Sequence, residues 1–169
     1  MKKNIILILC LLIFNLILFN IAVSANTTKT DDSFLSSVVI CYDDGSYLVI
    51  NLYTLLPTST NTYLLSPNAS YEKIGRKENI YSHSDGSELW KFTVTGLFLV
   101  TPGEFVECTY ASYSHNIYNS AWHFSNGESQ YYDNVAYGKG TFKQKVLLIT
   151  VKTVNVEISI NCDVQGNLY

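Results

Sequence analysis

Aromatic side chains are the residues of this sequence best suited to contact a ligand. The chain contains 13 Tyr, 8 Phe and 2 Trp, and many of them lie between residues 110 and 137. Rings with a polar edge, held on a rigid strand, can stack on sugars or dock a protein partner. We therefore predict a cell-wall glycan, a host glycan or a surface protein as partner. The predicted binding face consists of Tyr113, Tyr118, Trp122, Tyr131 and Tyr132.

A structural role is the alternative for the same aromatic residues. Trp122 and Tyr110 would then belong to the core, and the other tyrosines would reflect the preference of tyrosine for strands. Trp90 lies on an apolar strand face, so we assign it to the core. Tyr113 is expected on the outer surface, on the strand face opposite Cys108.

The sequence contains none of the short motifs that identify common catalytic or cofactor sites. His-Glu-x-x-His, Gly-x-Ser-x-Gly, a phosphate-binding loop and Cys-x-x-Cys are all absent. The three histidines are too few and too scattered to predict a zinc site. We therefore predict no catalytic residue, no metal and no cofactor. The alternative is a secreted hydrolase acting on glycans or cell wall, which would need two carboxylates facing each other across a cleft.

Residues 1–25 have the organisation of a secretory signal peptide. Lys2 and Lys3 precede an apolar run from Ile5 to Val23, and Val23-Ser24-Ala25 places small residues where a signal peptidase requires them. We predict cleavage after Ala25 and a secreted or cell-surface location. The alternative is a membrane anchor retained through residues 5–23, because this run approaches the roughly 20 residues that span a bilayer. Membrane contact is expected only if the segment is retained.

The charge balance of the chain is acidic. It has 11 basic and 14 acidic residues, a net charge of −3. Removal of Lys2 and Lys3 with the signal leaves 9 basic and 14 acidic residues, a net charge of −5. No basic excess is available to neutralise phosphates, so a nucleic-acid partner is not expected. The apolar fraction of 47% is too high for a disordered chain.

Most of the chain after the signal alternates apolar and polar residues with a period of two, as half-buried strands do. The clearest runs are residues 88–100 and 154–162, and residues 46–53 and 134–146 follow the same pattern. Gly-containing pairs separate the runs and predict turns. These pairs are Asp44-Gly45, Asp85-Gly86, Pro102-Gly103 and Asn126-Gly127.

The pattern predicts an all-β fold. Frequent turns and the lack of a helix-length amphipathic stretch indicate a single antiparallel β-sandwich of about seven to eight strands over residues 36–169. Residues 26–35 are polar at their start and are predicted to form a flexible leader. Residues 55–69 contain two prolines and are predicted to form a long loop.

Three cysteines remain after removal of the signal, and an exported chain permits disulfides. Cys108 and Cys162 both lie on apolar strand faces, which favours a bridge between them. A pair involving Cys41, or no bridge at all, are the alternatives. Without a bridge of its own, Cys41 would be a small buried thiol.

The C-terminal part of the chain resembles a known family. The residues that carry the resemblance are Leu89-Trp90-x-x-x-Val94-x-Gly96, Ser120-Ala121-Trp122 and Cys162-x-x-x-Gly166-x-Leu168. They are similar to stretches in small exported proteins of low-GC Gram-positive bacteria that share a domain of unknown function, over about residues 73–169. The resemblance implies an exported all-β domain with Cys108 and Cys162 as its usual cysteine pair, and it implies no activity.

The chain departs from this family at three positions. Tyr110 and Tyr113 stand where its members commonly have Ser or Thr, and Tyr169 stands where they have Ser. These departures bear on any shared ligand surface and leave the expected fold unchanged. We therefore expect an exported, non-catalytic binding module with an aromatic face.

Overall fold

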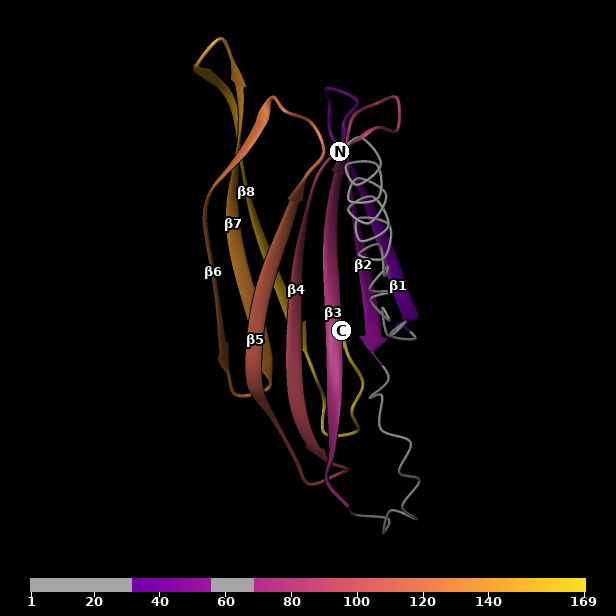
Figure 1. The fold of residues 1–169 in the computed structure, drawn as a ribbon. Coiled ribbons are helices and arrows are strands. Elements are labelled where there is room, and N and C mark those ends of the chain that lie inside the picture. The colour runs from indigo at the N-terminus through magenta and orange to yellow at the C-terminus, as the bar shows by residue number, and fades with distance from the viewer. Residues whose placement is uncertain (1–31, 56–68) are drawn as a thin grey trace, which may run out of the picture.

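The computed structural model describes residues 32–55 and 69–169, which are built from β-strands (Figure 1). The predicted signal segment and nearly all of the predicted loop at residues 55–69 lie outside these ranges. Each strand pairs antiparallel with its neighbour in the chain, except that β5 and β6 belong to different sheets. The strands are β1 (Asp32–Cys41), β2 (Tyr47–Leu55), β3 (Tyr71–Ser82), β4 (Glu88–Thr101), β5 (Phe105–Ile117), β6 (Trp122–Tyr132), β7 (Val135–Val146) and β8 (Ile149–Asn161).

The strands form a β-sandwich of two sheets, as the alternation predicted. A five-stranded sheet has the order β1-β2-β3-β4-β5, and a three-stranded sheet has the order β6-β7-β8. The smaller sheet packs against β3, β4 and β5. Strands β1 and β2 lie farther from the smaller sheet, although Leu48 and Leu52 of β2 are buried as part of the hydrophobic core.

Strand β1 differs from its prediction in two ways. It begins at Asp32, so residues 32–35 belong to a strand rather than to the predicted leader, and residues 26–31 lie outside the described ranges. It is also exposed along its whole length because it is an edge strand without a partner sheet over it. Cys41 is therefore exposed, and its expected burial is wrong.

Three of the four predicted turns are confirmed. Gly45, Gly86 and Gly103 have φ values of 79°, 91° and 75°, a region that glycine adopts without steric cost. The loops of the two Asp-Gly hairpins are longer than the Asp-Gly pair itself, because each backbone ladder closes outside that pair, as between Tyr42 and Ser46. Asp44 and Asp85 instead accept hydrogen bonds from the backbone N–H two residues on.

The fourth predicted turn, at Asn126-Gly127, is wrong. These residues lie inside β6, where the ladder with β7 is irregular between Phe124 and Asn126. The chain reverses later, at Asp133, whose φ is 47°. A glycine inside a strand can mark a bulge or a close approach of another element rather than a turn.

The core lies between β4 of the larger sheet and β7 and β8 of the smaller one. Trp90, Phe92, Val94, Phe98 and Val100 of β4 are fully buried, so the assignment of Trp90 to the core is confirmed. Opposite them lie Ala136, Phe142, Val156, Ile158 and Ile160, which are also buried.

Small residues let the two sheets approach closely. A Cβ added at Gly96 would lie 2.5 Å from the Cβ of Ala136, and one added at Gly138 would lie 2.5 Å from a methyl carbon of Val94. Neither position has room for a side chain, since real Cβ atoms do not approach other heavy atoms so closely. A Cβ added at Gly140 would likewise lie 2.7 Å from the Phe124 ring, so both glycines of β7 are needed for packing.

Candidate functional site

Tyr113 lies on the inner side of the larger sheet and not on its outer surface. It pairs with Val94, which is fully buried, and its ring stacks on Phe92 with the centroids 5.6 Å apart. A bulge opposite Leu97 and Phe98 leaves Thr109 without a partner in the register. One extra residue in a strand reverses the facing of every residue after it. The expected outer face of Tyr113 is therefore wrong, but Tyr113 lies on an edge strand and is still 36% exposed.

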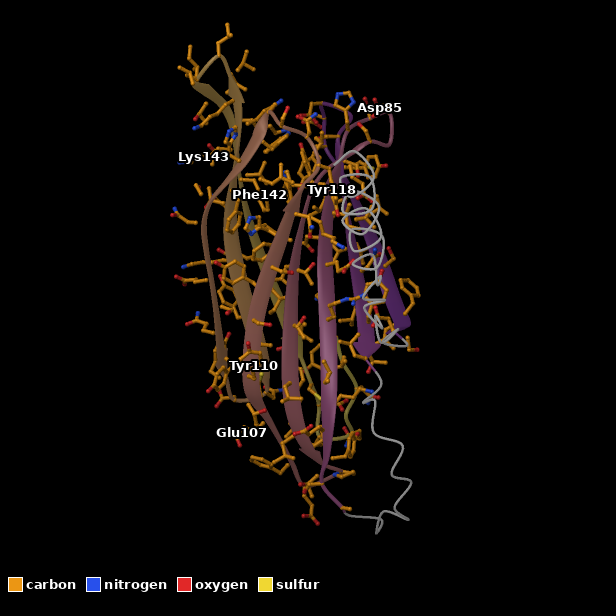
Figure 2. All side chains as sticks on the ribbon, in the orientation of Figure 1. Asp85, Glu107, Tyr110, Tyr118, Phe142 and Lys143 are labelled. Atoms are coloured by element: carbon orange, nitrogen blue, oxygen red, sulfur yellow. The ribbon has the colours of Figure 1, made fainter. Side chains whose placement is uncertain are left out.

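The same bulge places Tyr110 on the outer face. Tyr110 pairs with Leu97 and is 55% exposed, whereas Cys108, before the bulge, is 1% exposed. The core position considered for Tyr110 is therefore wrong. Figure 2 shows Tyr110 on the lower part of β5 and Tyr118 beyond the upper end of that strand.

The five predicted aromatic residues do not form one surface. Trp122 is 3% exposed, and it packs edge-on against Trp90 with the centroids 6.2 Å apart. Tyr131 and Tyr132 stand at the other end of β6, about 30 Å away at the usual rise of a strand. Being consecutive in a strand, they also point to opposite faces. The predicted aromatic face is therefore not assembled, although Tyr118, Tyr131 and Tyr132 are exposed individually.

A hollow lies on the outer face of the smaller sheet. Its volume is about 480 Å³, and its floor includes the backbone of Gly127 and Gly140, which lie opposite each other on β6 and β7. We call it the outer trough. Its side chains are Asn126, Glu128, Lys139, Thr141, Asn155 and Glu157.

The strand register explains why these polar residues meet. Lys139 pairs with Glu128 on one side and with Glu157 on the other, and Thr141 pairs in the same way with Asn126 and Asn155. Residues opposite one another on neighbouring strands have their Cβ atoms about 5 Å apart on the same face. Two rows of three polar side chains therefore cross the sheet side by side.

In each of the two rows, one pair of neighbouring side chains interacts directly. The Lys139 ammonium lies 2.8 Å from a Glu128 carboxylate oxygen, and this hydrogen bond raises the pKa of Lys139. The Thr141 hydroxyl donates to the Asn155 side-chain oxygen over 3.0 Å. The Glu157 carboxylate lies across Lys139 from Glu128 and makes no ion pair within the described ranges.

Tyr137 stands beside the trough. It precedes Lys139 by two residues, so it lies on the same face of β7, about 7 Å along the strand. Tyr137 pairs with Ser159, two residues from Glu157 on the same face of β8. Burial and then the Glu157 carboxylate raise the pKa of the Tyr137 hydroxyl. An aromatic face next to rows of hydrogen-bonding groups suits a ring with many hydroxyls.

The charged side chains of the trough are exposed to water. The ion-paired Glu128 and Lys139 side chains are 56% and 48% exposed, so water solvates both. A catalytic carboxylic acid is usually held in an apolar setting that favours its neutral form. Among the residues that the structure describes, no three His, Cys, Asp or Glu side chains gather where they could hold a metal ion.

The two predicted partner cysteines lie close together in the core. Cys108 and Cys162 are buried as thiols, and their backbone N–H groups donate to the consecutive carbonyls of Asp133 and Asn134, over 2.6 and 3.1 Å. Burial raises the pKa of Cys108, and burial together with the charge of Asp163 raises that of Cys162 to about 11. The β6–β7 turn therefore holds a cysteine from the end of each sheet.

The outer trough was not predicted from the sequence, although the pattern of β7 indicated some of its residues. The alternation already placed Tyr137, Lys139 and Thr141 on the face of β7 opposite Gly138 and Gly140. Nothing local in the sequence says which residues of β6 and β8 stand beside them. That signal lies in the strand register.

Comparison of the chain with protein-family models, with curated proteins and with solved structures found no match. Within the described ranges there is no helix of the length and apolarity needed to cross a membrane.

Proposed function

We propose that the protein is exported and serves as a non-catalytic binding module, with the outer trough as a glycan site. The observation that carries the proposal is the trough itself, a hollow lined by two rows of hydrogen-bonding side chains with the Tyr137 ring beside it. Amides, a hydroxyl and carboxylates together match the hydroxyl groups of a sugar. A cell-wall or host glycan is the ligand class that fits this chemistry.

Export is supported by the N-terminal sequence. Residues 1–25 combine a basic start, an apolar run and a small-residue cleavage site. An exported location also agrees with a disulfide between Cys108 and Cys162, which we propose as a staple between the two sheets. The mass of the secreted protein tests this part, since cleavage after Ala25 gives a chain that begins at Asn26.

Glycan binding is tested with the secreted protein on arrays of cell-wall fragments and host glycans. We expect Tyr137→Ala to weaken binding by about two- to tenfold, which corresponds to about 0.5–1.5 kcal/mol for one aromatic contact. Asn155→Ala should weaken it as well, through loss of a hydrogen-bonding side chain. Tyr110→Ala is the matched control, because Tyr110 is an exposed tyrosine on the other sheet.

Three outcomes would contradict the proposal in different ways. Equal loss of binding in Tyr137→Ala and Tyr110→Ala would mean that the trough is not the site. Retention only by a surface protein would replace the glycan as ligand. Release of new reducing ends from a bound glycan, abolished by Glu157→Gln, would make the protein the secreted hydrolase that the sequence left as an alternative.

A further inference from the structure

The tip of the β7–β8 hairpin is the most exposed apolar segment of the described ranges. Leu147 and Leu148 are 90% and 94% exposed, and Ile149 is 68% exposed. Val146 and Val151 complete the segment at 51% and 57%. Figure 1 shows this hairpin extending past the ends of the neighbouring strands. An apolar patch that packs against nothing marks an interaction site.

Leucine is energetically unfavourable in the backbone conformation of the tip. Leu147 and Leu148 have φ values of 48° and 74°, in the left-handed region that residues with a branched side chain rarely adopt. Hairpin turns of this shape usually carry Asn-Gly, which relieves that strain. Leu147 and Leu148 are thus unfavourable both for solubility, because they are exposed, and for the backbone, because their φ values are positive.

The tip also lacks support from the rest of the described fold. The last residue of β7 with a partner in β6 is Gln144, which pairs with Trp122. Beyond it, one hydrogen bond from the Lys145 N–H to the Ala121 carbonyl fixes the base of the hairpin. The residues from Val146 to Ile149 therefore project freely from the sandwich.

Positive charge surrounds the base of the tip. Lys143 and Lys145 lie just before it and Lys152 just after it, and the chain has no Asp or Glu from residue 134 to residue 156. Lys152 pairs with Asp44 over 2.6 Å. Within the part of the chain that the structure describes, Lys143 and Lys145 form no ion pair. Figure 2 shows Lys143 below the tip.

We propose that this hairpin tip inserts into the interface of a lipid bilayer that contains anionic lipids. The leucines would enter the boundary between headgroups and acyl chains, and Lys143 and Lys145 would remain at the level of the phosphates. A convex apolar tip with a basic base matches a negatively charged, deformable apolar surface. The net charge of the chain is −3, so this local positive charge stands out. The inference concerns a different part of the molecule from the outer trough and does not depend on it.

The test places a fluorescent side chain at the tip of the full chain. Leu148→Trp is mixed with vesicles of phosphatidylcholine and phosphatidylglycerol whose acyl chains carry bromine, a quencher of indole. We expect a blue shift and quenching of the introduced indole. Trp90 and Trp122 are buried and stay out of reach of the lipid, so the wild type gives the background. Readout at one site keeps the result independent of any membrane attachment through residues 5–23.

Phe105→Trp is the matched control. Phe105 is 48% exposed at the start of β5, at the other end of the sandwich (Figure 1), so its indole should stay unquenched. Adding Lys143→Gln and Lys145→Gln to Leu148→Trp should raise the lipid concentration for half-maximal quenching about tenfold or more on anionic vesicles. Neutral vesicles should show no such change. Lys143 and Lys145 are half-buried, so equal melting temperatures are needed to show that these substitutions leave the fold intact.

Two results would overturn the inference. One is an indole at position 148 that saturating lipid quenches no more than the indole at position 105. The other is a blue shift that appears without vesicles and grows with protein concentration, because the tip would then bind a second copy of the chain.

Discussion

Trp90 occupies the centre of the aromatic core. Its ring stacks on Phe142 with the centroids 4.0 Å apart and on Tyr81 at 5.1 Å, and its side chain is fully buried. Such a ring stabilises the fold in two ways, because its apolar area is removed from water and its faces make close contacts. Its indole N–H has no hydrogen-bond partner within the described ranges, so packing dominates its contribution.

We expect Trp90→Ala to lower the free energy of unfolding by about 3–5 kcal/mol, through lost burial and the cavity that remains. Denaturant unfolding followed by far-ultraviolet circular dichroism measures this loss. A loss below about 1 kcal/mol would contradict the central position of Trp90.

The two kinds of cysteine should differ in reactivity in the reduced protein. Burial and the charge of Asp163 raise the pKa of Cys162 from 9.0 to about 11, whereas Cys41 is exposed on an edge strand. At pH 8 only about one Cys162 thiol in a thousand is then ionised, and the thiolate is the reactive form. Iodoacetamide should modify Cys41 first, as peptide mapping after brief treatment would reveal.

The sign of the pH effect follows from the same shift. A thiol that stays neutral in the folded state favours folding below pH 9, and this contribution is lost as the pH rises from 9 toward 11. The reduced protein should therefore lose stability over that interval.

For the reactivity experiment, modification of Cys162 by iodoacetamide as fast as that of Cys41 at pH 8 would show that the Cys162 thiol is not buried.

At the level of the strands, one extra residue in β5 determines which of its side chains face the core and which face outward. The bulge at Thr109 reverses the alternation, so that Tyr113 packs on the core while Tyr110 faces outward. The inner position of Tyr113 is crowded, because a Cβ on Gly127 would lie 2.7 Å from its ring. Tyr113 thus packs between the sheets with one part of its ring and leaves the rest exposed at the edge strand.

We expect Tyr113→Ala to destabilise the fold by about 1–3 kcal/mol, because it removes a ring packed on Phe92 and Phe124. Tyr110→Ala should change stability by less than about 1 kcal/mol, as exposed positions usually do. The pair of melting curves compares two tyrosines on the same strand. The reverse order of losses would place the bulge elsewhere.

For the molecule as a whole, the ends of the two sheets meet at the β6–β7 turn. Cys108 belongs to the larger sheet and Cys162 follows the last strand of the smaller one, and both bond to the same turn. A covalent link there would close the chain from residue 108 to residue 162. For a loop of that length the chain-entropy model gives about 4 kcal/mol of stabilisation.

We expect peptide mapping without reduction to recover Cys108 joined to Cys162 in the secreted protein. Cys108→Ala should then cost about 2–5 kcal/mol, and Cys41→Ala, the matched control at an exposed cysteine, should cost less than about 1 kcal/mol. Recovery of Cys41 linked to either partner would contradict the pairing. Equal stability of the oxidised and reduced protein would contradict the staple.

The sequence by itself determined the class of fold and the composition of the strand faces. Alternation of apolar and polar residues is a local property, since successive side chains of a strand point to opposite sides. It was therefore sufficient to predict a sandwich, the buried face of β4 with Trp90, and the turns at Gly45, Gly86 and Gly103. The alternation also favoured a bridge between Cys108 and Cys162, and the resemblance to exported proteins implied the same pair.

Only the tertiary structure decided which of these faces meet. Strand register and bulges depend on the partner strand, so the sequence alone did not reveal the reversal at Thr109 or the rows of polar side chains around Lys139. The Leu147-Leu148 turn escaped prediction because it contains neither Gly nor Asn. Burial and exposure depend on what packs across the sandwich, and the sandwich places Trp122 in the core and leaves the two leucines in solvent.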